Sequence, residues 1–404
     1  MARSIPIFAQ KTASTVTAPE FRVSPPLALY VHVPWCVRKC PYCDFNSHEA
    51  NGKIPESEYV AALIADLQSA LPLIWGRPVV SVFFGGGTPS LLSPAAIDEL
   101  IAAFRALAML SPEAEITLEA NPGTVEADKF AGFRAAGVNR LSLGIQSFDD
   151  EHLKALGRIH GDAEARRAVQ LAGEHFEAFN LDLMYGLPGQ THEQALTDIE
   201  TALTFSPPHL SCYQLTLEPN TRFAAFPPEL PENDACADMQ EAIEARLAAA
   251  GYANYETSAF ALAGKQCRHN LNYWYFGDYL GIGAGAHSKL TLHDRVLRQM
   301  RWKHPSAYLE NVRAGSPVQE ENEVPARQLP FEFLMNALRL ADGFHPALFE
   351  ARTAQPLAVI LPGIRAAEAE NLLAVTPERI APTPKGRRFL NVLLERFLDD
   401  GAEN

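Results

Sequence analysis

Long hydrophobic runs are missing from this sequence. No uninterrupted apolar segment approaches the roughly 18–20 residues of a membrane span, and residues 1–23 hold no stretch that could form the core of a signal peptide. Positive charge is also scarce, because 34 Lys and Arg face 48 Asp and Glu and give a net charge of −14. This balance argues against a general nucleic-acid binder, and we expect a cytoplasmic protein whose thiols stay reduced.

The chain is too long for a single hydrophobic core. It has 404 residues, whereas one core stops growing at roughly 250–300 residues. We expect a disordered tail over residues 1–24, a large core domain over 25–310 and a smaller, mostly helical domain over 311–404. The acidic segment 316–325 is interpreted as a linker. An apolar stripe at helical spacing over 389–398 predicts a helix that starts at Thr383-Pro384.

Short apolar runs alternate with helical patterns through the first half of the chain. Such alternation favours parallel strands with right-handed helical crossovers, and six repeats are too few for an eight-stranded barrel. The sequence therefore predicts an α/β fold built on a partial (β/α)6 parallel barrel, with its chemistry at the carboxyl ends of the strands. The predicted strands are Leu27–Val33, Val79–Phe84, Glu115–Glu119, Arg140–Ile145, Asn180–Tyr185 and Leu210–Leu215. The predicted helices are Glu56–Ile74, Pro94–Ala108, Glu126–Ala136, Asp162–Glu174 and Glu193–Thr204.

Three of the six cysteines, Cys36, Cys40 and Cys43, are clustered directly after the first predicted strand. Three thiolates on one short loop can hold a metal centre. Structural zinc usually takes four protein ligands and bacterial ferredoxins add a fourth cysteine close by, but this sequence has no further cysteine near the loop. The spacing favours a [4Fe–4S] cluster that leaves one iron open, with a zinc loop and unligated thiols as the alternatives.

Glycines and polar residues follow the later strands. Gly85, Gly86 and Gly87 precede Thr88 at the end of the second predicted strand, and glycines let backbone groups approach a ligand because no Cβ intervenes. An acid in an apolar strand needs a partner or a ligand to offset its desolvation. Convergence of such side chains at one barrel mouth therefore indicates a binding site. The residues concerned are Glu119, Gln146, Arg158 and Asp182.

The segment Tyr30-Val-His-Val-Pro-Trp-Cys36-x3-Cys40-Pro-Tyr42-Cys43 resembles the opening motif of radical S-adenosylmethionine (SAM) proteins, specifically the oxygen-independent coproporphyrinogen III oxidase family. The resemblance implies a barrel of the radical SAM type and a winged-helix-like C-terminal domain. It also implies that the open iron chelates SAM and that an electron from the cluster cleaves the sulfonium to a 5′-deoxyadenosyl radical. Carried over to this sequence, the SAM-binding positions are Tyr30, Tyr42, Gly86, Gly87, Thr88, Glu119, Gln146, Arg158 and Asp182.

Two features place the chain within that family. The oxidases carry a further Cys two residues after the third cluster ligand, where this chain has Phe45. The segment His269-Asn-Leu-Asn-Tyr273-Trp274 resembles a signature of the family's haem-chaperone branch. It makes His269 the candidate haem ligand, with Tyr273 and Trp274 stacking on the porphyrin. The alternatives are a structural histidine bonded to a backbone carbonyl, and ligation by the thiolate of Cys267.

These features favour a haem chaperone that binds a [4Fe–4S] cluster, SAM and haem. Its partners are expected to be an electron donor and an acceptor haem protein, such as a membrane respiratory enzyme, and not a nucleic acid. The first alternative is an enzyme that decarboxylates coproporphyrinogen III. The second is a radical SAM enzyme with a non-porphyrin substrate. The sequence leaves the oligomeric state open.

Overall fold

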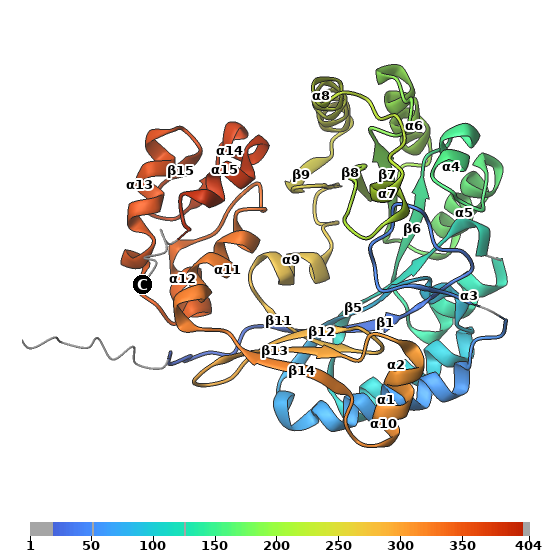
Figure 1. Ribbon diagram of the computed structural model, residues 1–404, viewed down its shortest axis with the longest axis horizontal. Helices are drawn as coiled ribbons and strands as arrows, with labels where there is room; N and C mark the ends of the chain where they lie inside the picture. The colour runs from blue at the N-terminus through green and yellow to red at the C-terminus, as the bar shows by residue number, and fades with distance from the viewer. Residues whose placement is uncertain (1–18, 51, 125–126, 399–404) are drawn as a thin grey trace, which may run out of the picture.

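The computed structural model describes residues 19–50, 52–124 and 127–398. Most of the tail expected over residues 1–24 lies outside this part of the chain, as does Glu126, the predicted first residue of a helix. Figure 1 shows a large curved sheet with helices on its outer side and a separate group of helices near the C-terminus. The concave side of the sheet faces this second group.

Six parallel strands form the centre of the sheet and lie side by side in chain order. Each neighbouring pair is parallel, so each connection crosses back over one face of the sheet. This arrangement confirms the predicted α/β fold with a partial parallel barrel. The strands are β1 (Leu27–Val33), β4 (Pro78–Gly86), β5 (Met109–Ala120), β6 (Arg140–Gln146), β7 (Phe179–Tyr185) and β8 (His209–Gln214).

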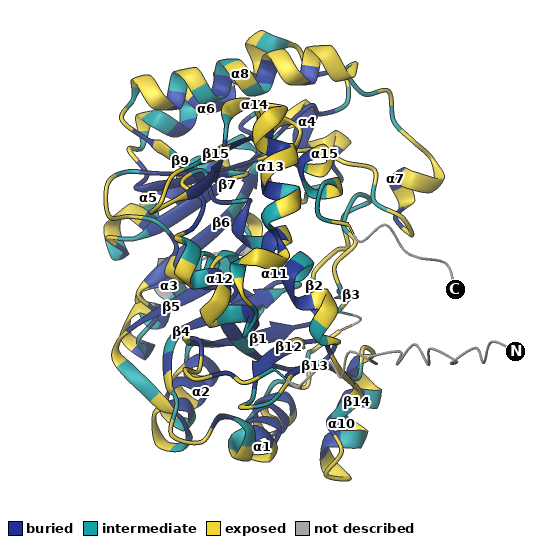
Figure 2. Ribbon diagram, turned by 90° about the vertical axis from the view of Figure 1, so that its left-hand side faces the viewer, coloured by how far each residue is buried: buried dark blue, intermediate teal, exposed yellow. Residues whose placement is uncertain are grey.

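The crossover helices pack on the outer face of the sheet, and Figure 2 shows their outward sides exposed while the strands are buried. N-terminal caps explain where several begin: Ser93 Oγ accepts a hydrogen bond from the amide of Ala96, and Thr191 forms a capping box with Gln194. None of the helices in the described ranges is long and apolar enough to span a bilayer. The sequence predicts all of these crossover helices except α4. They are α1 (Glu56–Ile74), α2 (Pro94–Leu107), α3 (Ala127–Ala136), α4 (Asp150–Ala155), α5 (Asp162–His175) and α6 (His192–Thr204).

The sheet is wider than the sequence predicts, because further strands extend it at both edges. β11 pairs parallel to β1, and three antiparallel strands follow it. The acidic segment 316–325 is therefore not a linker but contains the edge strand β14. Its glutamates are exposed, and charge on an edge strand discourages pairing with another chain. The added strands are β11 (Asp278–Ile282), β12 (His287–Thr291), β13 (Val296–Arg301) and β14 (Val318–Glu323) at one edge, and β9 (Ala253–Glu256) and β10 (Ala259–Ala261) at the other.

The glycine-rich stretch after β11 packs closely against β1. Gly283 has a φ of +102°, and a Cβ there would lie 2.4 Å from the carbonyl oxygen of His32, so only glycine fits. Beside it, the buried carboxylate of Asp66 on α1 accepts hydrogen bonds from the Gly283 amide, the Arg301 guanidinium and the Tyr308 hydroxyl. These bonds fix the added strands to α1 and support the end of β1, where the cysteine loop begins.

The C-terminal helices enclose a hydrophobic core of their own around Phe333, Phe344 and Phe349. Three helices precede a two-stranded antiparallel hairpin, which is the element order of a winged-helix unit. The helix predicted from Thr383-Pro384 to residue 398 starts there, with Thr383 as its N-cap, but it is divided at Phe389 and ends at Glu395. Phe389 is 53% exposed rather than part of a buried stripe. The elements are α11 (Leu329–Ala337), α12 (Pro346–Thr353), α13 (Leu361–Ala369), β15 (Leu373–Val375), β16 (Ile380–Pro382), α14 (Pro384–Arg388) and α15 (Leu390–Glu395). Between the sheet strands lie α7 (Arg222–Ala225), α8 (Asn233–Ala249), α9 (Arg268–Trp274) and α10 (Pro305–Arg313).

Candidate functional site

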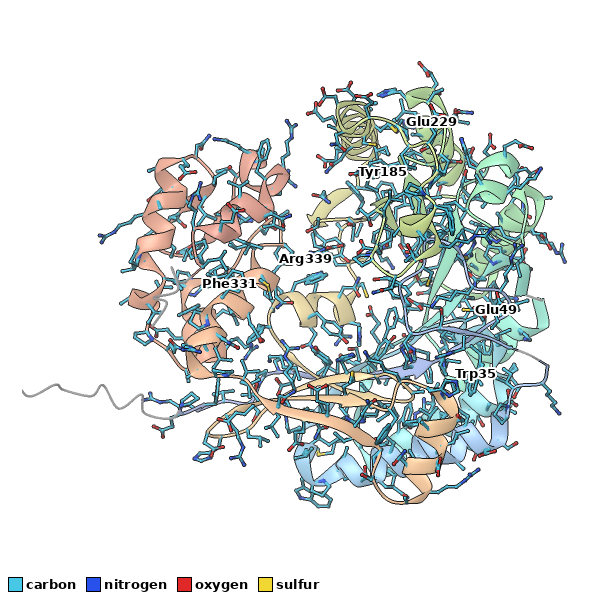
Figure 3. All side chains as sticks on the ribbon, viewed as in Figure 1. Trp35, Glu49, Tyr185, Glu229, Phe331 and Arg339 are labelled. Carbon is cyan, nitrogen blue, oxygen red and sulfur yellow. The ribbon has the colours of Figure 1, made fainter. Side chains whose placement is uncertain are left out.

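The three clustered cysteines lie on a loop that two short parallel strands, β2 (Trp35–Cys36) and β3 (His48–Glu49), close at its base. Trp35 and Glu49, both labelled in Figure 3, mark these two strands. Within the loop, the amide of Cys43 donates a hydrogen bond to the carbonyl oxygen of Cys40 at 3.2 Å. The backbone therefore helps to fix the loop, while its three cysteines form no disulfide and are half-buried.

A cavity of about 300 Å³ opens beside this loop, at the carboxyl ends of the parallel strands. All three cysteines line it, as do eight of the nine positions carried over as SAM-binding residues. The ninth, Tyr30, is not among the lining residues. Its hydroxyl is hydrogen-bonded to Nδ1 of His32 at 3.0 Å, and its ring stacks on Phe83. Tyr30 therefore supports the wall from behind rather than facing the cavity.

The glycine run at the end of β4 forms one wall of the cavity. Gly86 has a φ of +113°, and a Cβ on Gly87 would lie 2.5 Å from the carbonyl oxygen of Trp35. The amide of Gly87 donates a hydrogen bond to the carbonyl oxygen of Val33, and that of Gly86 donates to Oε2 of Glu119. Glycine is required here because the strand end passes so close to the base of the cysteine loop.

Two carboxyl groups face the cavity from different strands. Glu119 lies near the end of β5, and burial together with the nearby Asp182 raises the pKa of Glu119 to about 8. On β7, Asp182 accepts hydrogen bonds from Ser142 Oγ at 3.0 Å and Asn180 Nδ2 at 2.8 Å, while burial raises its pKa. A positively charged ligand would offset the cost of ionising both groups in this buried place.

Arg158 and Gln146 also line the cavity. Gln146 ends β6 with a φ of +69°, a conformation that costs a non-glycine residue on the order of 1–3 kcal/mol and is typical of functional sites. The Arg158 guanidinium donates hydrogen bonds to Oδ1 of Asn121 and to the carbonyl oxygen of Gly144, at 2.5 and 2.8 Å. Asn121 Nδ2 in turn donates to Thr88 Oγ1 at 3.0 Å. These bonds connect the loops that follow three neighbouring strands.

Aromatic side chains surround the mouth. Tyr42 packs on Phe223 with the ring centroids 6.3 Å apart, and Phe45 is 61% exposed at the cavity edge.

The structure also adds lining residues that the sequence analysis missed. Side chains two residues apart share one face of a strand, so this period would have added Ser142 on the face of Gln146 and Met184 beside Asp182. Asn121, two residues after Glu119, was another such candidate. Tyr213 has no such signal, because the sequence analysis places no candidate residue on β8.

The residues predicted to bind haem lie elsewhere, on α9 (Arg268–Trp274), which packs against β4, β1, β11 and α11. The His269 side chain is 2% exposed, its Nδ1 is hydrogen-bonded to Ser81 Oγ at 3.0 Å, and its ring stacks on Phe83 at 4.9 Å. Burial and the nearby Arg140 lower its pKa to about 3, so the imidazole is neutral. Its Nε2 is buried and has no hydrogen-bond partner among the described residues.

Aromatic rings and one arginine surround the end of α9. The Tyr273 ring contacts His269 edge-on at 5.1 Å and Tyr279 at 4.4 Å. The Arg339 guanidinium lies 4.5 Å from the centre of the Trp274 ring. Figure 3 shows Arg339 where the C-terminal helices face α9. The three predicted haem residues thus lie together, but apart from the cysteine-lined cavity.

Glu115 on β5 anchors the start of α9. Its carboxylate accepts hydrogen bonds from the amides of Arg268 and His269, at 3.1 and 3.0 Å, and from the Cys267 thiol at 3.4 Å. The guanidinium of Arg140 lies 3.9 Å from the same carboxylate. Burial raises the pKa of Cys267 to about 12. Its sulfur is therefore a protonated hydrogen-bond donor here, which does not fit a thiolate that ligates haem.

A chain of buried hydrogen bonds connects the two regions. Asn180 donates to Asp182 at the cavity and is bonded through Oδ1 to Nδ1 of His209 at 2.6 Å. Nε2 of His209 is bonded to the Tyr255 hydroxyl at 2.8 Å, and that hydroxyl accepts a hydrogen bond from the amide of Cys267 at 3.2 Å. The interior of the barrel is therefore polar from the cavity to the start of α9.

The donor set fits an iron–sulfur cluster with SAM beside it. Three thiols, the ligands that such clusters use, line a cavity of about 300 Å³. Over the described ranges, no three His, Cys, Asp or Glu side chains are arranged to hold a single metal ion. The Arg158 guanidinium suits a carboxylate, and Glu119 and Asp182 suit the cationic groups of SAM.

Two family models match the chain: the radical SAM superfamily over residues 30–202 and the HemN C-terminal domain over residues 324–389. The heme chaperone HemW of Escherichia coli is 51% identical over 376 residues, which cover 93% of this chain and 98% of that protein. The heme chaperone HemW of Haemophilus influenzae is 49% identical over 382 residues, covering 93% and 99%. The chain belongs to the HemW family.

The HemW family fold is shared with a solved radical SAM enzyme. Coproporphyrinogen III oxidase (HemN) from Escherichia coli superposes with a TM-score of 0.79 at 25% identity, covering 93% of this chain and 90% of that one. This confirms the predicted α/β fold of the radical SAM type with a helical C-terminal domain. Membership of the radical SAM superfamily implies a [4Fe–4S] cluster and SAM, and the matched region contains the cysteine loop.

Proposed function

We propose that this protein is a haem chaperone that holds a [4Fe–4S] cluster on Cys36, Cys40 and Cys43 and transfers haem to an acceptor haem protein. The proteins named heme chaperone HemW match nearly the whole chain. The observation that carries the proposal is Phe45, which is 61% exposed at the cavity edge. The related oxidases have a cysteine at this position. The chain therefore lacks a residue of the decarboxylases next to the three cysteines that would hold the cluster.

We propose that SAM occupies the cavity next to the cluster. Arg158 pairs with its carboxylate, the backbone at Gly86 and Gly87 approaches its amino group, and Glu119 and Asp182 balance its positive charge. A cluster held by the three cysteines would be able to supply an electron to this ligand. The protein's part is to orient the sulfonium, to exclude water and to compensate charge. The remaining carried-over positions are Tyr42, Thr88 and Gln146 in the wall and Tyr30 behind it.

For haem, we propose a site on α9 with His269 as the ligand. Nε2 is the imidazole nitrogen without a hydrogen-bond partner in the described part of the chain, so it is the atom available to iron. Because His269 is 2% exposed and packs on Ser81 and Phe83 of β4, haem can reach it only if α9 moves away from the sheet. Tyr273 and Trp274 would then stack on the porphyrin, and the Arg339 guanidinium over Trp274 is close enough to pair with a propionate.

The proposed setting follows from this role. The protein works in the cytoplasm and requires an electron donor for the cluster. The acceptor is a haem protein, and a membrane respiratory enzyme is the class we propose. Nucleic acid has no part in this scheme, in line with the net charge of −14.

Haem binding tests the proposal. The full chain is purified without oxygen, its cluster is reconstituted, and haem is added while the Soret band is followed. We expect tight binding and transfer to a haem-free acceptor, with weaker binding in His269→Ala. Trp75→Ala, at an 82% exposed side chain outside both regions, serves as the matched control and should bind as the parent does. No haem binding in both cluster-loaded and cluster-free protein would contradict the proposal.

The structural similarity to HemN favours one other function, the oxidative decarboxylation of coproporphyrinogen III. Incubation of the cluster-loaded protein with coproporphyrinogen III, SAM and a reductant distinguishes the two. A chaperone yields no protoporphyrinogen while it still binds SAM. Formation of protoporphyrinogen at a sustained rate would replace the chaperone proposal with the enzyme.

A further inference from the structure

Arg158 makes one contact that binding the SAM carboxylate does not explain. Its Nη1 donates a hydrogen bond to Sγ of Cys40 at 3.5 Å. The other arm of the guanidinium, Nη2, is fixed by Asn121 Oδ1 and the carbonyl oxygen of Gly144. The planar guanidinium is therefore held in place through Nη2, and Nη1 points at the thiol of Cys40.

The backbone sets this direction as well. The amide of Arg158 donates a hydrogen bond to the carbonyl oxygen of Leu153 at 2.9 Å, which closes the turn after α4. The preceding Gly157 has a φ of +69°, and a Cβ there would lie 2.8 Å from the ring of Pro41 in the cysteine loop. On the far side, the amide of Phe223 donates to the carbonyl oxygen of Pro41 at 3.0 Å. The turn after α4 and the cysteine loop are therefore packed together, and this packing keeps the guanidinium of Arg158 next to Cys40.

The other two cysteines have neutral hydrogen-bonding neighbours, although the charge of Lys39 also acts on Cys43. Sγ of Cys43 lies 3.8 Å from the hydroxyl of Ser47, and the hydroxyls of Thr88 and Ser47 act on the Cys36 thiol against the effect of burial on its pKa. Among the hydrogen bonds to the loop's sulfurs over the described residues, the one from Arg158 has a charged donor. One corner of a bound cluster would therefore differ from the other two.

A hydrogen bond to a ligand sulfur stabilises the more negative redox state of an iron–sulfur cluster, and such bonds help to set its reduction potential. Bonds from a charged donor are roughly twice as strong as neutral ones. Reduction adds one electron to the cluster and breaks no bond. We propose, on the basis of the cluster site proposed above, that Arg158 is also a positioning residue for the cluster: by donating to Cys40 it raises the reduction potential.

The test is a redox titration of the full, anaerobically reconstituted chain without SAM, with dithionite as reductant and the electron paramagnetic resonance signal of the reduced cluster as readout. We expect Arg158→Gln to shift the midpoint potential to more negative values. Arg158→Lys keeps the charge without the fork and should shift it less. Lys39→Gln is the matched control, since this ammonium lies in the same loop but donates to the carbonyl oxygens of Phe45 and Ser47 rather than to sulfur.

The inference fails if Arg158→Gln holds a full cluster and its potential differs from that of the parent by no more than that of Lys39→Gln. It also fails if Arg158→Gln and Arg158→Lys both lose their iron, because the guanidinium then serves assembly alone. Neither outcome changes the haem titration of the parent protein, so the proposed function is tested separately. By contrast, a parent that binds no iron overturns the cluster site itself.

Discussion

The cysteine-lined cavity and the α9 region lie in the same barrel interior, yet they are built differently. The cavity contains a strained Gln146, glycines that no other residue could replace, and a carboxyl group, Glu119, whose pKa burial raises to about 8. The α9 region is closed. His269 is 2% exposed, and the carboxylate of Glu115 accepts hydrogen bonds from the amides at the start of the helix. The cavity is organised for a ligand before the ligand arrives, whereas haem binding at α9 requires the structure to open.

The largest expected difference concerns the two kinds of cysteine. Cys40→Ala removes one of three cluster ligands and should abolish the visible absorbance of the reconstituted cluster. Cys267→Ala removes a buried, protonated thiol and should leave that absorbance in place. Both spectra are recorded after identical anaerobic reconstitution. Equal absorbance in the two variants would mean that the clustered cysteines do not hold the iron.

The second prediction concerns the closed region. Glu115→Ala removes the carboxylate that accepts three hydrogen bonds at the start of α9 and leaves the guanidinium of Arg140 buried without its partner. Loss of one partner from a buried pair costs about 3–5 kcal/mol, and denaturant unfolding measures it. Glu177→Ala, at an exposed position, is the control and should change stability by less than about 0.5 kcal/mol. A similar small change in both would show that Glu115 does not anchor the helix.

The smallest effect concerns the acids of the cavity. Because the pKa of Glu119 is raised to about 8, its carboxyl group is largely protonated at neutral pH and must lose a proton to balance a cationic ligand. SAM affinity should therefore rise with pH up to about 8, by at most about tenfold per pH unit, and then level off. Glu119→Gln should weaken binding and flatten this profile while leaving the cluster absorbance in place. Isothermal titration calorimetry at several pH values measures both, and an unchanged slope in the variant would exclude Glu119 as the titrating group.

The sequence predicts the parallel half of the fold well for a simple reason. Buried strands such as β1 and β7 are mostly apolar and alternate with amphipathic helices. Parallel strands also bring their carboxyl ends together, so Asp182 and Gln146 can be placed at one mouth without knowing any contact. The antiparallel strands at the edge of the sheet cannot be predicted in this way. β14, for example, is short, acidic and exposed, and its sequence resembles that of a linker.

Other features depend on contacts that no local pattern encodes. Tyr30 lies on β1, but which side of the wall its ring occupies is decided by His32 and Phe83. The distance of α9 from the cavity follows from Glu115, which lies far from it in the sequence. The hydrogen bond between Arg158 and Cys40 likewise joins two loops that only the packed turn brings together.

The central claim is that three thiols hold a cluster whose fourth iron is open to SAM. Mössbauer spectroscopy of the full chain reconstituted with ⁵⁷Fe, recorded with and without SAM, tests it most directly. The account predicts that about one quarter of the iron, the iron without a cysteine ligand, changes its signal when SAM is added. A spectrum that SAM leaves unchanged, or a protein that takes up zinc in place of iron, would contradict it.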